Sequence, residues 1–527
     1  MTFFSICASL GIDGSCLLVD LPQPAIIPNA ISNNAIFLIN NKVLCKDKKS
    51  DAKGTVPSVD IFSKRPRKEP SLLRRFCVPL QAIMKIELAG SYGYGRMMRS
   101  SIPSILMMLI TSVYGIVDGL FVSNFAGTTA FAAINLVWPA IMLLGALGLL
   151  FGTGGSALVA MIIGQGDRER ANRAFTMIVR FMLMLGLLMA VLFFVFARPV
   201  VILLGAQGEL VHLCVLYGRI LVLVMPLFMC QMSFQSFYMT AEIPQLGTKL
   251  TIICGVINIT LDALFIVVLG WGVVGAAIAS AAGMAVGGLY PLYYFTSKRR
   301  NKTKLKFTRT RTEWNYVGRA CTNGLSEYVG NISLSIVSMC YNLQLMRLIG
   351  ESGVAVYGIL LYIGFIYASV FIGFNITISP VISYNYGAQN LPELKSLLRK
   401  SLILLFVAGS ILTVMSEVLS GPMAGMFVSY DPQLKALTAR AIRIYMISFM
   451  ICGLNMFVSA FFTALNNGLV SAVAAFTRTL IFELGAIFIL PLFLGLDGVW
   501  LAVDVADVLA LIMSAILLTA FRSRYRY

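Results

Sequence analysis

Residues 108–125 read MLITSVYGIVDGLFVSNF, an apolar stretch interrupted by one acidic side chain, Asp118. A helix of about 20 apolar residues can cross the hydrocarbon layer of a membrane, and runs of that length recur along most of the chain. A carboxylate at the centre of a bilayer costs at least about 2.5–3.5 kcal/mol, so such a residue usually faces a polar interior and has a function. Both the fold and the function therefore depend on what surrounds Asp118.

The composition is that of a membrane protein. Of the 527 residues, 58% are hydrophobic and only 12% are charged, and the mean hydropathy is +0.85. A soluble globular chain carries about 25% charged residues. The long, continuous apolar runs favour helices over the short alternating strands of a barrel. The net charge of +18 is explained by Lys and Arg in cytoplasmic loops, so no nucleic-acid partner is predicted.

Twelve membrane-spanning helices are predicted, which makes the fold class an all-α membrane protein. Lys and Arg gather in every second loop and at the C-terminus, and they are densest in the loop 296–316. This asymmetry predicts a multi-pass protein with both termini in the cytoplasm. The predicted spans are 102–123, 131–163, 175–196, 210–240, 248–269, 272–295, 317–348, 355–382, 401–419, 437–464, 471–494 and 498–520.

The sequence repeats itself with an offset of 223 residues, which lays the first six spans over the last six. Six spans per repeat give both halves the same orientation, which predicts two six-helix bundles related by a pseudo-twofold axis along the membrane normal, with a cavity between them. Aligned pairs include Gly127 and Gly350, Gly164 and Gly387, and Pro199 and Pro422.

The repeat predicts three parts of the chain. We expect an N-terminal bundle over 84–300 and a C-terminal bundle over 301–527. Residues 1–83 are polar, charged and proline-bearing, which predicts a disordered extension. A wrongly chosen start codon upstream of Met84 would explain that extension.

The N-terminal half contains a candidate cation site. Asn258 and Asp262 are four residues apart in the fifth span and share one helix face. Counting about 1.5 Å per residue places Asp118 and Asp262 at similar heights, and Ser280 on the sixth span falls near them. Two close carboxylates with an amide and a hydroxyl could bind a proton or a sodium ion reversibly. The alternative is a structural hydrogen-bond network, and for Ser280 it is simple helix packing.

The C-terminal half has a different set of polar residues within its spans. Arg478 and Glu483 on the eleventh span are expected to pair as structural contacts, and Asp504 and Asp507 lie on the twelfth. The position that matches Asp118 is Tyr341, so ion coupling is expected mainly in the first half. The candidate polar site of this half consists of Glu327, Asn331, Tyr341, Asn342 and Asn375.

The sequence offers no basis for an enzyme. The ten cysteines are scattered without a CxxC pair, and His212 is the only histidine, so neither a metal site nor a redox motif is indicated. There is no nucleophile–base arrangement and no nucleotide-binding loop. No cofactor is therefore predicted, and the energy for transport is expected to come from an ion gradient.

Four stretches carry a resemblance to a known family. They are VDGLFVSNFAGTTAFAAINLVWP (117–139), GQGDRERANRAF (164–175), NITLDALFIVVLGWGVVGAAIAS (258–280) and YGAQN (386–390). With the two parallel six-span repeats, they resemble the multidrug and toxic compound extrusion (MATE) family, in its prokaryotic branch near DinF and MepA. The resemblance extends over about residues 90–522.

This resemblance implies a function and a site. The family exports amphipathic, often cationic drugs by alternating access in exchange for protons or sodium. Its N-lobe cation site matches Asp118, Asn258, Asp262 and Ser280 here. The acidic residue that the NorM branch carries on its tenth span has no counterpart in 437–464, so no second sodium site is expected. We expect a monomeric exporter in the cell inner membrane, whose partners are small molecules and membrane lipids. A flippase for lipid-linked precursors is the alternative.

Overall fold

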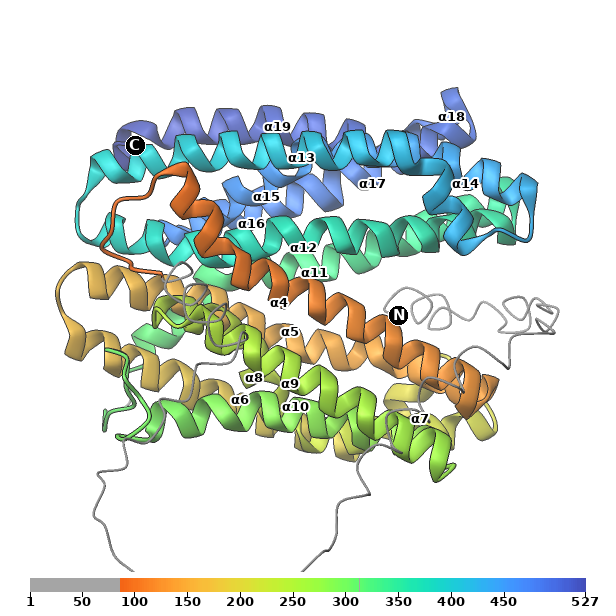
Figure 1. Cartoon of the computed structure of the whole chain (residues 1–527), viewed down its shortest axis with the longest axis horizontal. Coiled ribbons are helices and arrows are strands. Elements are labelled where there is room, and N and C mark those ends of the chain that lie inside the picture. The colour runs from red at the N-terminus through yellow and green to blue at the C-terminus, as the bar shows by residue number, and fades with distance from the viewer. Residues whose placement is uncertain (1–85, 312) are drawn as a thin grey trace, which may run out of the picture. The chain divides into compact units, whose positions relative to one another are not determined.

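Helices make up nearly all of the described chain (Figure 1). The structure is a computed structural model that describes residues 86–311 and 313–527. Within these ranges, eleven helices are long and apolar enough to cross a membrane, and a bent pair of helices provides a twelfth. The predicted all-α fold with twelve spans is therefore confirmed. The expected extension 1–83 and the start at Met84 lie outside the described residues.

The first half contains six spans that alternate in direction. The fourth span is broken at Val224, where its two helices meet at 59°. The bounds are α4 (Tyr94–Phe121) with the π-helical segment η2 (Val122–Ala126), α5 (Thr128–Gly164), α6 (Arg168–Leu203), α7 (Glu209–Leu223) with α8 (Met225–Thr240), α9 (Pro244–Asp262) with the π-helical segment η3 (Ala263–Val268), and α10 (Gly272–Thr296).

The second half repeats this order after a loop. The bounds are α11 (Trp314–Ile349), α12 (Glu351–Gly387), α13 (Leu391–Phe427), α14 (Pro432–Tyr445) with η4 (Met446–Ser448) and α15 (Phe449–Ala464), α16 (Gly468–Phe476) with the π-helical segment η5 (Thr477–Glu483), α17 (Leu484–Ile489) and α18 (Pro491–Leu494), and α19 (Leu496–Tyr525). The helices of each half pack mainly on one another, and in Figure 1 the two halves form an upper and a lower layer.

The helices extend beyond the apolar runs because capping residues decide where they begin. The ninth span was predicted over 401–419, whereas α13 begins at Leu391. The Asn390 side chain caps α13 by accepting a hydrogen bond from the Glu393 backbone N–H. Asp167 caps α6 in the same way. These two caps are 223 residues apart, so the repeat extends to the caps of its helices.

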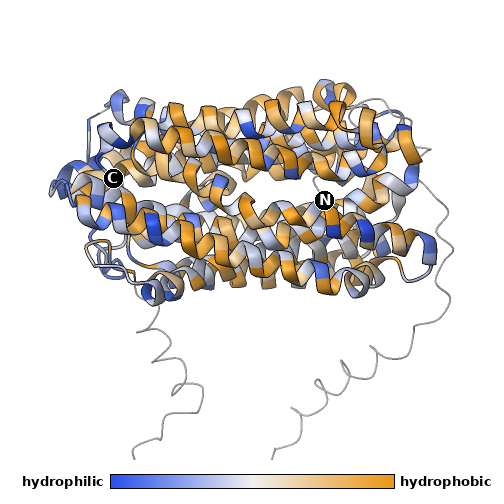
Figure 2. Ribbon diagram, turned by 90° about the horizontal axis from the view of Figure 1, so that it is seen from above, coloured by the Kyte–Doolittle hydropathy of each residue, from blue (hydrophilic) through white to orange (hydrophobic). Residues whose placement is uncertain are grey.

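The two ends of the helical bundles differ in charge. One end, called the basic end below, carries the loop 297–313, the turns 165–167 and 241–243, and the C-terminus. Hydrophilic residues gather at this end in Figure 2. The opposite end is called the far end. The loops that the sequence groups by charge therefore do lie together at one end of the structure.

The two halves meet at a close crossing near the basic end. A Cβ atom at Gly164 on α5 would collide with the carbonyl oxygen of Tyr384, and one at Gly387 on α12 would collide with that of Met161. These glycines are the pair that the 223-residue offset aligns, so the repeat is visible here as a contact between equivalent positions. Nearer the middle of the spans, the hydroxyls of Ser104 on α4 and Thr377 on α12 hydrogen-bond at 2.7 Å.

A short segment before the first span bridges the halves at the same end. Within this segment, residues 86–93, the backbone N–H of Leu88 donates to Glu242 Oε1 at 2.8 Å, and that of Tyr92 donates to Glu393 Oε1 at 2.7 Å. Lys400 Nζ donates to the Tyr92 carbonyl at 2.6 Å. Glu242 follows α8 in the first half, whereas Glu393 and Lys400 lie on α13 in the second. We call residues 86–93 the strap.

Candidate functional site

The acidic residues of the first half lie deep in the helical bundle, toward the far end. Asp118 on α4 is about 12 Å from the end of η2, and Ser280 on α10 is about 12 Å from the start of that helix, at roughly 1.5 Å per residue. Asp262 closes α9 and is 0% exposed. The structure therefore brings these three residues to one depth, as the sequence predicts.

Each acid lies where its helix changes form. The α-helical hydrogen bonding of α4 gives way to the π-helical segment η2 four residues after Asp118, and that of α9 gives way to η3 directly after Asp262. Single-turn π-helical segments are rare and occur frequently at functional sites, because they re-aim side chains and leave backbone groups free. The two carboxyl groups are thus carried by locally irregular helix rather than by regular spans.

The carboxyl groups of Asp118 and Asp262 interact directly with one another. Neither oxygen of Asp262, nor Oδ1 of Asp118, receives a hydrogen bond from a donor among the described residues. No Lys or Arg in the described part of the chain forms an ion pair with either acid. Since two carboxylates cannot donate to each other, the contact becomes a hydrogen bond only when one of them carries a proton.

The other two predicted residues lie beside this pair. Asn258 Nδ2 donates to Ser280 Oγ at 3.5 Å, which links α9 to α10. Asn258 lies one turn before Asp262 on the same helix and is buried, and its Oδ1 atom has no donor among the described residues. The set thus offers two carboxyl groups, an amide oxygen and a hydroxyl. These are all hard oxygen ligands, which suit a proton or an alkali cation.

One nearby residue was missed by the sequence. Tyr217 on α7 is buried and interacts electrostatically with both Asp118 and Asp262. It belongs to the fourth span, which reads as an ordinary apolar run with no acidic residue. Only the break at Val224, which separates α7 from α8, sets this span apart, and the sequence around it gives no glycine signal for the break.

The candidate polar residues of the second half do not form one site. Glu327 and Tyr341 are separated by 14 residues on α11, or about 21 Å along the helix. Asn331 is exposed and donates to the Glu327 carbonyl at 2.7 Å. Asn342 and Asn375 are buried, on α11 and α12. The five residues therefore divide into separate groups at different depths.

The expected pairing of Arg478 with Glu483 is also corrected. Arg478 Nε instead donates to Asp507 Oδ1 at 2.6 Å, and its guanidinium also reaches Cys452 Sγ at 3.1 Å. Asp507 is further held by Asn455 Nδ2, which donates to Asp507 Oδ1 at 3.2 Å. The strongest ion pair in this half thus joins the eleventh span to the twelfth, and it leaves Glu483 to other neighbours.

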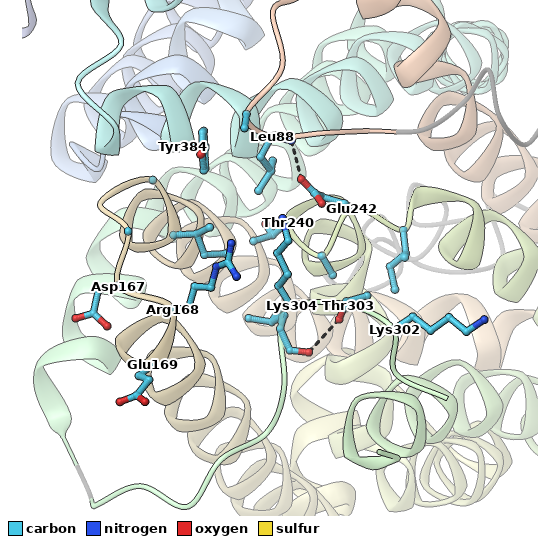
Figure 3. A pocket seen from close by; sticks show the side chains of 17 residues that line it. Leu88, Asp167, Arg168, Glu169, Thr240, Glu242, Lys302, Thr303, Lys304 and Tyr384 are labelled. Carbon is cyan, nitrogen blue, oxygen red and sulfur yellow. Dashed lines mark hydrogen bonds between the residues drawn. The ribbon is translucent and has the colours of Figure 1, made fainter. Parts of the chain in front are cut away.

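A cavity of about 930 Å³ lies at the basic end, remote from these acids (Figure 3). Arg168, Lys304, Glu242, Leu88 and Tyr384 are among the residues that line it. Basic and acidic side chains are mixed in the lining, so the cavity has no strong preference for either charge. The described residues contain no group of three or more His, Cys, Asp or Glu side chains placed to hold a metal ion.

Comparisons with known proteins agree with this architecture. A sequence model of the MatE family matches residues 103–264 and again residues 328–488, which together make up more than half of the chain. The two matches are displaced by about 225 residues, close to the offset of the internal repeat. The chain belongs to the MatE family.

Relatives and solved structures support the same conclusion. The multidrug export protein MepA of Staphylococcus haemolyticus is 23% identical over 429 residues, which cover 81% of this chain and 94% of the relative. A crystal structure of MATE in complex with MaL6 superposes with a TM-score of 0.79 at 24% identity and covers 83% of this chain and 98% of that one. An outward-facing multidrug resistance MATE family transporter has a TM-score of 0.77 at 25% identity, with the same coverage.

Membership of this family makes the chain a multi-pass membrane transporter rather than an enzyme. The resemblance that the four sequence stretches carry is thereby confirmed, as is the twelve-span fold in two related bundles. Ion coupling is general in such transporters. The ion itself, the substrates and the roles of the individual acids are matters for proposal.

Proposed function

We propose that this MatE-family transporter exports amphipathic, often cationic, drug-like compounds by antiport with protons or sodium. The bundles 84–300 and 301–527 are the units that move against each other. The observation that carries the proposal is the Asp118–Asp262 pair, which is buried, faces itself, and has neither a basic partner nor a hydrogen-bond donor to Asp262. Such a pair needs a cation in its neutral state, so its occupancy can be linked to an ion gradient.

The position of the pair suits access from outside the cell. Asp118, Asp262 and Ser280 lie toward the far end, and the halves make their closest crossing at the opposite, basic end. If the basic end is cytoplasmic, as its loops favour, this structure is closed to the cytoplasm. We place both termini in the cytoplasm and the protein in the bacterial inner membrane, as a monomer that needs no cofactor.

The transport cycle follows from these positions. A substrate binds between the bundles when the basic end is open, and the bundles then rock to the state seen here. A cation from outside binds at Asp118 and Asp262, where the irregular helix of η2 and η3 can rearrange, and drives the substrate out. One charge moving down a potential of 100 mV supplies about 2.3 kcal/mol, so one or two ions support a modest substrate gradient.

Dye efflux from membrane vesicles tests this function. Vesicles are given either a proton gradient or a sodium gradient, and the wild type is compared with Asp118→Asn and Asp262→Asn. We expect one gradient to drive efflux in the wild type, and both substitutions to reduce its rate at least about tenfold, since each removes a carboxyl group of the coupling site. Glu209→Gln, at an exposed position in the first turn of α7, is the matched control.

The outcomes separate the alternatives. Gradient-driven efflux that persists unchanged in both variants would contradict the proposed coupling site. A wild type that moves no dye under either gradient, but exposes labelled lipid across proteoliposomes, would replace the drug-export function with lipid-precursor flipping.

A further inference from the structure

The second half carries a buried acidic cluster that the sequence did not assemble. Glu483 ends η5, Asp504 and Asp507 lie on α19, and Tyr341 lies on α11. Both Glu483 and Asp504 are only 9% exposed, and Asp507 and Tyr341 are more deeply buried still. Three carboxyl groups thus share one region inside the helical bundle.

The cluster occupies the same place in its half as the Asp118–Asp262 pair does in the first. It is built on the seventh, eleventh and twelfth spans, and the first-half site is built on the first, fifth and sixth. The 223-residue offset carries Asp118 to Tyr341, carries Asp262 to a position two residues after Glu483, and carries Ser280 to the neighbour of Asp504. Tyr341 and Asp504 are each about 12 Å from the far end of their helices, as Asp118 is.

A single basic residue serves these three acids. Arg478 is engaged by Asp507, which it holds through Nε at 2.6 Å and through a terminal nitrogen at 3.4 Å. Asn455 completes the contacts of Asp507. One acid is therefore neutralised, and Glu483 and Asp504 are left as surplus carboxyl groups.

Two of the surrounding polar groups are unpartnered. Neither oxygen of Asp504 receives a hydrogen bond within the described part of the chain, and the hydroxyl of the fully buried Tyr341 has no partner there either. Tyr341 interacts with both Glu483 and Asp504. An ionised carboxylate without a donor or a counter-ion is costly at this depth, whereas a protonated one is not.

From this geometry we propose a second proton-binding site in the C-terminal half, formed by Glu483 and Asp504 with the Tyr341 hydroxyl. The absence of a three-ligand metal group among the described residues favours a proton over a metal ion. The use of this proton in transport rests on the proposed antiport, but its binding does not. The titratable and charged groups that face the site from the packed elements are Tyr341 (α11), Tyr357 (α12), Tyr445 (α14), Cys452 (α15), Arg478 (η5) and Asp507 (α19).

Infrared difference spectroscopy on the purified protein tests the site without substrate or gradient. Protonated carboxyl groups give a C=O stretching band that ionised groups lack, so a titration shows which acids hold protons. The starting variant combines Asp118→Asn with Asp262→Asn to silence the first half. We expect it to keep a protonated-carboxyl band at neutral pH, and we expect Glu483→Gln with Asp504→Asn to remove that band. Asp497→Asn, an acid in the first turn of α19 that is paired with Arg440, should leave it unchanged.

A further variant separates proton binding from a structural role. Asp507→Asn releases the Arg478 guanidinium, which should then favour the ionised forms of Glu483 and Asp504 and weaken the band. If the combined variant fails to fold, Asp504→Asn alone should still remove part of the band.

Two results would overturn the proposal. One is a band that does not change when folded protein loses Glu483 and Asp504. The other is a band that sodium chloride, but not choline chloride, abolishes at constant pH, since the site would then hold sodium. Failed dye efflux with an intact band would contradict the proposed function and leave this site standing.

Discussion

The two halves of the molecule share a fold but treat buried charge differently. In the first half, Asp118 and Asp262 face one another with no basic residue among the described ones paired to either. In the second, Arg478 neutralises Asp507 and leaves Glu483 and Asp504 in surplus. Each half thus arrives at two uncompensated carboxyl groups by a different route. A pseudo-twofold repeat therefore conserves the position of a site more strictly than the residues that form it.

Irregular helix accompanies the charge in both halves. The π-helical segments in the described chain are η2, η3 and η5, and each lies beside or contains an acid of these clusters. A regular α-helix keeps its backbone groups paired and its side chains on fixed faces, whereas a π-helical turn allows a side chain to be re-aimed. The segments indicate where the spans can change shape when a cation binds or leaves.

The largest effect is expected from removing the only charge compensation in the second cluster. Arg478→Met leaves Asp507 buried without its partner, which should lower stability by about 3–5 kcal/mol. Thermal melting in detergent measures this loss, and Arg478→Met combined with Asp507→Leu should restore most of it. Asp118→Asn should not destabilise the protein, since it removes an acid that no basic residue among the described ones pairs with.

Arg440→Met provides the control for this comparison. Arg440 pairs with Asp497 at a largely exposed position, where an ion pair contributes at most about 1 kcal/mol. Equal losses from Arg478→Met and Arg440→Met would show that the buried pair has no special role and would remove the contrast between the two halves.

Much of the fold could be predicted from the sequence because hydropathy reports burial in lipid directly. The twelve spans, the repeat and the depth of Asp118 and Asp262 followed from run lengths and a constant offset. Helix ends were less well predicted, as at α13, because capping by Asn390 and not hydropathy sets them. The first-half site was within reach because its acids stand out from apolar runs and Asn258 shares a helix face with Asp262.

The second-half site was out of reach because it depends on contacts between helices. Arg478 could have paired with Glu483 on its own span or with an acid on the next, and a rotation by a single residue, about 100°, decides between them. The π-helical segment η5 changes that rotation and leaves no clear mark in the sequence. The five-residue set around Glu327 failed for a simpler reason, since the spacing to Tyr341 already implied separate depths.

A smaller effect is expected where the halves cross. Gly164→Ala and Gly387→Ala each add a Cβ against a carbonyl oxygen of the other half, which should cost about 1–3 kcal/mol in the state closed at the basic end. Labelling of an introduced cysteine near this crossing should become faster in both variants. Because the positions are equivalent in the repeat, the two rates should rise by similar factors.

Gly358→Ala is the matched control on α12. A Cβ at Gly358 meets no atom within 4 Å, so closure should be unaffected. A large effect at Gly164 with none at Gly387 would show that the crossing is not symmetric and that the two halves contribute unequally to the closed state.

The smallest effect is expected at the strap, where the comparison between halves becomes one between two anchors. Glu242 is the first-half anchor and accepts from the Leu88 backbone N–H, whereas Tyr92 is held from the second half by both Glu393 and Lys400. Replacing Glu242 with Gln weakens a charge-assisted hydrogen bond by about 0.5–1.5 kcal/mol. Hydrogen exchange of a peptide that covers 86–93 should therefore become several-fold faster.

Glu393→Gln should accelerate exchange less than Glu242→Gln, because Lys400 still holds the Tyr92 carbonyl at 2.6 Å. Glu169→Gln, an exposed acid in the first turn of α6 at the same end, is the control and should change nothing. Opening at the basic end must stretch or release the strap, since its two anchors lie in different halves. If both substitutions speed exchange equally, Lys400 adds nothing to the second anchor, and the strap is held with the same strength on both sides.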